Sequence, residues 1–76
     1  MTIRVGDWVR RRDEFQDSWW KQRCREKYKK DHRDAFRIVN IHKDVTLELE
    51  GWTSTWDALR FNKVPPPKPF NEADYL

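Results

Sequence analysis

The sequence predicts a mainly β fold, a small closed barrel of about five short strands. The chain has 76 residues, enough for one domain whose core is thin, because so short a chain buries only about 60% of its unfolded surface. Short apolar stretches separated by turn residues lie at 5–9, 36–41 and 47–51. Trp56 and Phe61 follow the last stretch, and we expect both in the core.

The first strand is expected within residues 3–12. Gly6 and Asp7 favour a turn near its start. Side chains alternate between the two faces of a strand, so Val9 is expected to face the core. The opposite face then carries Trp8, Arg10 and Arg12.

The second and third strands are expected at residues 35–42 and 44–50. In the second strand, the step from Ile38 to Ile41 breaks the strict alternation of apolar residues, which predicts a bulge. The third has the most regular alternation in the chain. Its apolar face is formed by Val45, Leu47 and Leu49.

The remaining elements follow Gly51, which allows a tight turn into a fourth strand at residues 52–56. Residues 57–60 are expected to form one helical turn. Residues 62–64 then form a short closing strand, which completes the predicted five.

Proline divides the chain into two parts. It cannot continue a strand ladder, so residues 65–69 are expected to leave the sheet as an extended polyproline segment. We therefore predict a barrel domain at 1–64, with an insertion at about 17–34, and a proline-rich tail at 65–76. The tail is either a linker end or a docking strip for a partner.

The connection at residues 13–34 is long for so small a domain. Within this connection, residues suited to a core recur at every fourth position: Trp20, Cys24 and Tyr28. This spacing favours a helix capped by Asp17 or Ser18, or a partly ordered charged excursion. The alternative is that Trp19 and Trp20 begin another strand, so that only residues 23–34 loop out.

The two adjacent tryptophans cannot both enter one thin core. Neighbouring residues point to opposite faces of a strand, and in a helix they lie about 100° apart. One of Trp19 and Trp20 is therefore expected to be exposed or to lie at an interface. For Trp8 and Trp52, a core position and an aromatic cleft both remain open.

Positive charge is concentrated in the same connection. The whole chain carries +3, whereas residues 18–34 hold seven basic and three acidic residues, a balance of +4. Cations interleaved with aromatic rings supply phosphate contacts and stacking faces for nucleic acid. Tryptophan and arginine are also frequent anchors of protein interfaces. The simplest interpretation is a solvated helix whose apolar stripe lies on the barrel.

The candidate binding residues come from this basic segment, with additions from outside it. Candidates for contact with a partner are Trp19, Trp20, Lys21, Arg23, Arg25, Lys27, Tyr28, Lys29, Lys30 and Arg33. Secondary candidates are Arg10, Arg12, Trp52 and Phe70. The two arginines would extend a positive patch from the first strand, and Phe70 would anchor the tail.

Catalysis and metal binding are not expected. The single cysteine, Cys24, excludes an internal disulfide and a multi-cysteine zinc site. With His32 and His42 it lacks the spacing of metal ligands. Cys24 and His32 lie in a charged segment without a glycine-rich turn to form an oxyanion hole. We therefore expect no enzyme activity, no metal and no cofactor.

Two sets of residues resemble a known pattern. The first is Val5, Gly6, Asp7 and Val9, and the second is Leu49, Glu50, Gly51, Trp56, Arg60, Phe61 and Val64. They resemble small uncharacterised SH3-like β-barrel proteins of bacteriophages and prophages. The resemblance implies an SH3-like barrel and a phage-type origin, and it carries no activity with it. The segment 17–34 and the tail 65–76 depart from that pattern.

Together these features predict a non-catalytic accessory protein of phage type. Its expected partner is a host protein that it inhibits or redirects. The alternative is RNA or DNA bound by residues 18–33, and a third interpretation is self-assembly through strand edges. No apolar run in the sequence is long enough to cross a bilayer, and we expect the cytoplasm of the bacterial host cell.

Overall fold

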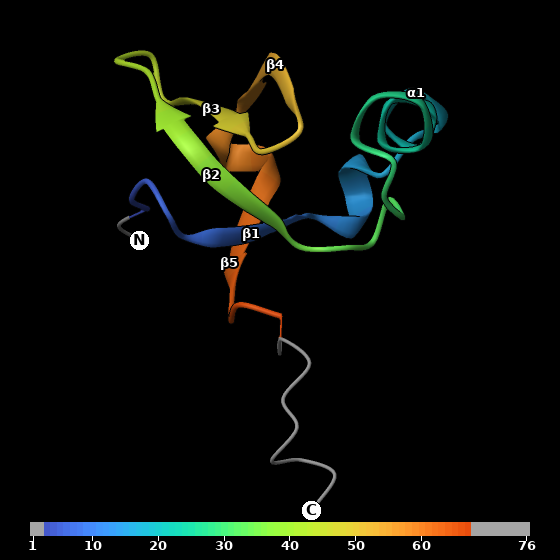
Figure 1. Cartoon of the computed structure of the whole chain (residues 1–76), viewed down its shortest axis with the longest axis horizontal. Helices are drawn as coiled ribbons and strands as arrows, with labels where there is room; N and C mark the ends of the chain where they lie inside the picture. Colours follow the sequence, from blue (N-terminus) through green and yellow to red (C-terminus); the bar gives the residue numbers. More distant parts are fainter. Residues whose placement is uncertain (1–2, 68–76) are drawn as a thin grey trace, which may run out of the picture.

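The fold was derived from a computed structural model, which describes residues 3–67. Five strands form one antiparallel sheet in the order β4-β3-β2-β1-β5 (Figure 1). Their bounds are β1 Trp8–Arg11, β2 Phe36–Ile41, β3 Thr46–Leu49, β4 Trp52–Asp57 and β5 Phe61–Val64. The predicted mainly β fold of five strands is confirmed. The sheet is open, so the predicted closed barrel is not observed.

Pairing in the sheet follows the sequence pattern closely. Consecutive strands pair from β1 to β4, and β5 returns to pair with β1 from Trp8↔Val64 to Arg11↔Phe61. The ladder between β2 and β3 shifts register between Ile38 and Asn40, which confirms the predicted bulge. A 3₁₀ turn at Ala58–Arg60 joins β4 to β5, as expected.

Residues 18–28 of the insertion are helical. Residues Ser18–Arg23 form α1, and a π-helical turn at Cys24–Tyr28 continues it. Asp17 caps the helix by accepting a hydrogen bond from the Trp20 backbone N–H at 2.9 Å. The alternative of a strand at Trp19 and Trp20 is therefore wrong. Figure 1 shows α1 to one side of the strands.

The helix contributes directly to the core. Trp20, Cys24 and Tyr28 are buried and join a cluster with residues of all five strands. The other members are Val9, Phe36, Ile38, Leu47, Leu49, Trp56, Ala58 and Phe61. The predicted core positions of Val9, Trp56 and Phe61 are confirmed. The insertion therefore supplies part of the hydrophobic core that the strands share.

The first strand agrees with the prediction, and the third differs from it at one residue. β1 begins at Trp8, after a turn at residues 5–6 in which the Gly6 N–H bonds the Ile38 carbonyl at 2.8 Å. Val45, expected on the apolar face of β3, is instead 56% exposed. It belongs to the turn between β2 and β3 rather than to the strand.

The tail begins directly after the last strand of the sheet. β5 ends at Val64, and residues 65–67 follow it as exposed, irregular chain. Phe70, the candidate anchor in the tail, lies outside the described residues. Within residues 3–67, none of the helices has the length and apolarity needed to span a bilayer.

One charged side chain lies at the centre of the core. Arg11 is 1% exposed, on the same face of β1 as Val9. Its guanidinium carbon lies 4.8, 5.6 and 5.4 Å from the ring centroids of Trp20, Trp56 and Phe61, respectively. Its Nε donates a 2.7 Å hydrogen bond to the Phe15 carbonyl. Desolvation by burial lowers the Arg11 pKa below its ordinary value, and the side chain stays a cation at neutral pH.

Replacing Arg11 should expose its structural role. Arg11→Ala is expected to lower the free energy of unfolding by about 3 kcal/mol, because it opens a cavity between three rings and leaves the Phe15 carbonyl without a donor. Arg11→Lys should lose about 1–2 kcal/mol, because an ammonium cannot stack flat on a ring. Urea denaturation followed by tryptophan fluorescence measures both changes.

The matched control for Arg11 is Arg37→Ala, since the Arg37 side chain is 52% exposed on the neighbouring strand β2. Its effect on unfolding should stay within about 0.5 kcal/mol. If Arg11→Ala were no more destabilising than this control, the buried guanidinium would contribute nothing to the core.

Val45 has an unfavourable backbone conformation. Its φ angle is 62°, in the left-handed region that a β-branched residue avoids. Hydrogen bonds from Val45 N–H to the His42 carbonyl (3.0 Å) and from His42 N–H to the Thr46 carbonyl (2.9 Å) hold it in a three-residue hairpin loop. Glycine or asparagine suits this loop position better.

Val45→Asn should therefore raise the free energy of unfolding by about 1 kcal/mol, because asparagine tolerates the left-handed conformation. Thermal and urea unfolding measure the gain. Val45→Ala keeps a β-carbon but lacks the side-chain amide with which asparagine can form local hydrogen bonds. Its free energy of unfolding should therefore change less than that of Val45→Asn. Unchanged or lower stability in Val45→Asn would contradict a strained turn.

Candidate functional site

Three residues of the insertion and one of β4 form a cation–aromatic surface, which we define as Trp19, Arg23, Lys27 and Trp52. Trp19 and Lys27 are exposed, whereas Arg23 and Trp52 are half-buried. Trp19 is 48% exposed, whereas its neighbour Trp20 is fully buried, as expected for adjacent tryptophans on one helix. Trp19, Arg23 and Lys27 recur every four residues, so they lie along one side of the helical segment. Trp52, at the start of β4, completes the surface.

Arg23 is held by the two indole rings. Its guanidinium carbon lies 5.4 Å from the Trp19 ring centroid and 5.8 Å from that of Trp52. The Lys27 ammonium lies 5.8 Å from the Trp52 centroid. Cation–π contacts of this length restrain the cations without neutralising them. Within residues 3–67, no carboxylate forms an ion pair with Arg23 or Lys27.

The indole of Trp19 is itself supported from the core. Its ring centroid lies 5.1 Å from that of Trp56 in an edge-on contact, and Trp56 is buried. One side of Trp19 is thus packed while the rest stays accessible. Such an amphipathic, partly fixed ring loses little conformational entropy when it binds a partner.

Two predicted contact residues belong to the core instead. Trp20 is fully buried and its indole N–H donates to the His32 carbonyl at 3.1 Å. The Tyr28 hydroxyl accepts a 2.6 Å hydrogen bond from the Trp56 indole, and burial raises the Tyr28 pKa to about 12. Trp20 has no surface to offer a partner, because it is surrounded by other rings, whereas Tyr28 keeps a small exposed part that lines a pocket. The prediction of Trp20 as a contact residue is therefore corrected, and that of Tyr28 is limited to the part that lines the pocket.

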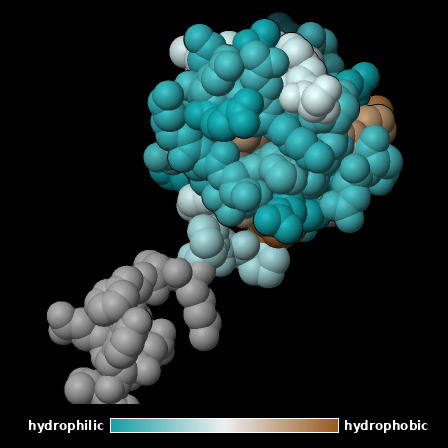
Figure 2. Space-filling model, turned by 90° about the vertical axis from the view of Figure 1, so that its right-hand side faces the viewer, coloured by the Kyte–Doolittle hydropathy of each residue, from teal (hydrophilic) through white to brown (hydrophobic). Residues whose placement is uncertain are grey.

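The other cations of the basic segment lie outside the cation–aromatic surface. Lys21, Arg25 and Lys29 are exposed and also recur every four residues, so they form a second row along the helical segment. The Arg33 side chain pairs with Asp31 at 3.3 Å. Figure 2 shows the face on the α1 side as hydrophilic over most of its area, with small paler regions.

Arg10 of β1 and Arg12, the residue that follows the strand, have local structural partners. The Arg10 side chain donates to the Arg33 carbonyl and to Asp13, both at 3.0 Å, which ties the end of the insertion to the sheet. Arg12 lies 3.9 Å from Glu14. These contacts hold Arg10 beside the end of the basic segment, and a positive patch that includes Arg10 and Arg12 stays a prediction.

Cys24 is buried in the core. Desolvation by burial raises its pKa to about 12, so the side chain is a protonated thiol at neutral pH. Among residues 3–67, no three His, Cys, Asp or Glu side chains cluster as metal ligands would.

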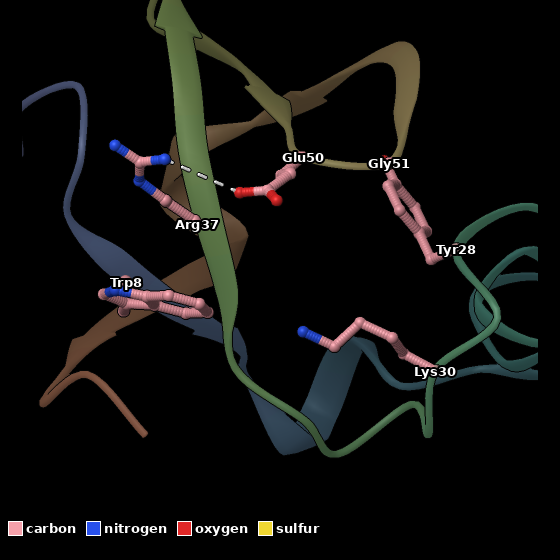
Figure 3. Close-up of a pocket in the computed structure, with 6 residues that line it drawn as sticks. All are labelled: Trp8, Tyr28, Lys30, Arg37, Glu50 and Gly51. Atoms are coloured by element: carbon pink, nitrogen blue, oxygen red, sulfur yellow. Dashed lines mark ion pairs between the residues drawn. The ribbon is translucent and has the colours of Figure 1, made fainter. Parts of the chain in front are cut away.

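A pocket that the sequence did not reveal adjoins the cation–aromatic surface. It measures about 210 Å³ and is lined by Trp8, Tyr28, Lys30, Arg37, Glu50 and Gly51 (Figure 3). Lys30 was predicted as a contact residue, whereas Arg37 and Glu50 were not. They meet because β2 and β3 are neighbours, with the Glu50 N–H bonded to the Arg37 carbonyl at 2.9 Å. Only knowledge of the strand register places them together.

Comparison with protein-family models, with curated proteins and with solved structures gave no match for this chain. The surface geometry is therefore the basis for assigning a function.

The different environments of the two tryptophans can be tested by substitution. Trp20→Ala should lower the free energy of unfolding by about 3–5 kcal/mol, since it empties the centre of the core. Trp19→Ala should lose only about 1 kcal/mol, because half of the ring already faces solvent. Chemical denaturation of both variants checks this, and equal losses would contradict the assignment of Trp19 to a surface.

Proposed function

We propose that this chain is a non-catalytic accessory protein of phage type that binds a bacterial host protein through the cation–aromatic surface. The observation that carries the proposal is the exposed Trp19 next to Arg23, which is held between two indole rings and has no carboxylate partner among residues 3–67. Binding would inhibit or redirect the host protein in the cytoplasm.

The composition of this surface supports a protein partner. Tryptophan and arginine dominate the energetic centres of protein interfaces, where a buried aromatic ring is surrounded by near-neutral contacts. Trp19 would be the anchor, and Arg23 and Lys27 would meet carboxylates on the partner. Because the rings already restrain Arg23, little side-chain entropy is lost when it pairs.

We also infer an SH3-like arrangement for the sheet, in an open form. Two features support it: β5 returns to pair with β1, and a 3₁₀ turn separates β4 from β5. The resemblance of the strand motifs to phage SH3-like proteins points the same way. In this arrangement the helical insertion between β1 and β2 is the part that distinguishes the chain.

A nucleic-acid partner is the second candidate, and one observation favours it. Lys21, Arg25 and Lys29 are exposed and, within residues 3–67, have no ion-pair partner, so they are available to phosphates. Against it, Arg23 lies over the Trp19 ring where a base would stack. The protein partner is therefore preferred.

The experiment is a pull-down of the tagged chain from bacterial lysate, with and without nuclease. Trp19→Ala combined with Lys27→Ala should lose a nuclease-resistant host protein, with affinity for the purified partner falling about tenfold or more. The matched control is Lys21→Ala combined with Arg25→Ala, which removes two cations from the same helical segment but outside the surface. That control should retain the partner.

Other results would redirect the assignment. Capture that disappears with nuclease and falls equally in both double variants, with a steep salt dependence, would identify nucleic acid as the partner. Recovery of the chain itself, with a sedimentation coefficient that falls on dilution, would identify self-assembly. Either result would overturn the host-protein proposal.

A further inference from the structure

The pocket beside the cation–aromatic surface carries a more specific inference, which rests on the proposed function. We propose that it accepts a single carboxylate side chain, aspartate or glutamate, from the partner protein. The pocket would then select partners that place one acidic residue next to the contact with Trp19.

The Lys30 ammonium is fixed at one wall of this pocket. It lies 4.5 Å from the Phe36 ring centroid and 5.6 Å from that of Trp8, and it donates a hydrogen bond to the Ala35 carbonyl. An ammonium has three donors, so two remain for a ligand. In Figure 3 the Lys30 side chain extends into the space between Tyr28 and Trp8.

Arg37 provides a second cation on the opposite wall, and it is only loosely paired. Its guanidinium lies 3.8 Å from the Glu50 carboxylate, and both side chains are more than half exposed. Exposed pairs of this length contribute little energy, so Arg37 can turn to an incoming anion. Lys30, Arg37 and Glu50 together give the pocket a charge of +1, from two cations and one anion.

Charge and size together indicate which anion fits. A net charge of +1 matches one carboxylate, whereas Glu50 repels the second negative charge of a phosphate. The volume of about 210 Å³ is below the range of about 300–1,000 Å³ that is usual for small-molecule ligands. The pocket is therefore suited to one side chain rather than to a nucleotide.

The pocket is continuous with the cation–aromatic surface. Tyr28 lines the pocket, and its ring centroid lies 5.9 Å from that of Trp52. Gly51, directly before Trp52, closes the same wall. A β-carbon at Gly51 would come within 3.1 Å of the Tyr28 ring, so only glycine lets the turn approach this closely. One partner can therefore cover both sites.

The test is an NMR titration of the full chain with N-acetylglutamic acid α-amide, with the neutral N-acetylglutamine α-amide as the matched probe. At constant ionic strength, the Trp8 indole N–H signal should shift saturably with the acidic probe only. Lys30→Met should weaken this binding about tenfold, the effect of losing one ionic contact. Glu50→Gln should tighten it about threefold and raise affinity for inorganic phosphate more strongly.

Three results would overturn the pocket assignment: equal shifts from both probes, saturable binding that Lys30→Met leaves unchanged, or weaker binding in Glu50→Gln. Glu50 is exposed, so Glu50→Gln should fold even if Lys30→Met does not. The predicted gain in affinity of Glu50→Gln for the acidic probe can then still be measured. If binding of a host partner is lost in Trp19→Ala but is unchanged in the Lys30 and Glu50 variants, the pocket assignment is overturned and the proposed function stands. Binding of the acidic probe without any host partner would overturn the proposed function and leave the pocket standing.

Discussion

The fold depends on one buried cation held by aromatic rings. Arg11 of β1 lies among Trp20 of α1, Trp56 of β4 and Phe61 of β5, and donates to the Phe15 carbonyl before the helix. These residues are distant in the sequence, so one guanidinium joins the insertion to both edges of the sheet. Its desolvation is unfavourable, and only the ring faces and the carbonyl compensate for it. The core is therefore specific for a planar cation at this position.

This arrangement explains how a short helical segment serves both core and surface. Arg11 holds Trp20 inward, and the helical period then turns Trp19 outward, with Arg23 and Lys27 following it along the exposed side. Trp56 contacts both tryptophans, with centroids 5.1 Å from Trp19 and 5.0 Å from Trp20. The candidate binding surface is thus fixed by the same cluster that stabilises the fold.

Sequence periodicity placed the strands and the bulge after Ile38, and it favoured the helical stripe through Trp20 without excluding a strand there, because these features depend on local side-chain spacing. Arg11 was missed although alternation puts it on the face of Val9, because a charged residue is normally expected at the surface. Val45 was misplaced because the hairpin hydrogen bonds, rather than its β-branched side chain, decide where the strand begins. The pocket depends on the strand register that joins Arg37 to Glu50, which no local pattern contains.

The same geometry shows why the charge of the basic segment is a poor guide to its function. The helical segment ends at Tyr28, and the next residue, Lys29, has a φ of 58° that turns the chain so that Lys30 lies over Phe36. The seven cations fall into four groups: Arg23 and Lys27 on the aromatic rings, Lys30 in the pocket, Arg33 paired with Asp31, and three exposed side chains that form no ion pair within residues 3–67. Three of the seven cations, Lys21, Arg25 and Lys29, lie in one row along the segment, so the balance of +4 is not presented to a partner as one continuous strip. Arg23 and Lys27 are instead restrained by the indole rings that they contact. Cations fixed in this way favour a partner with carboxylates at defined positions, which a folded protein supplies.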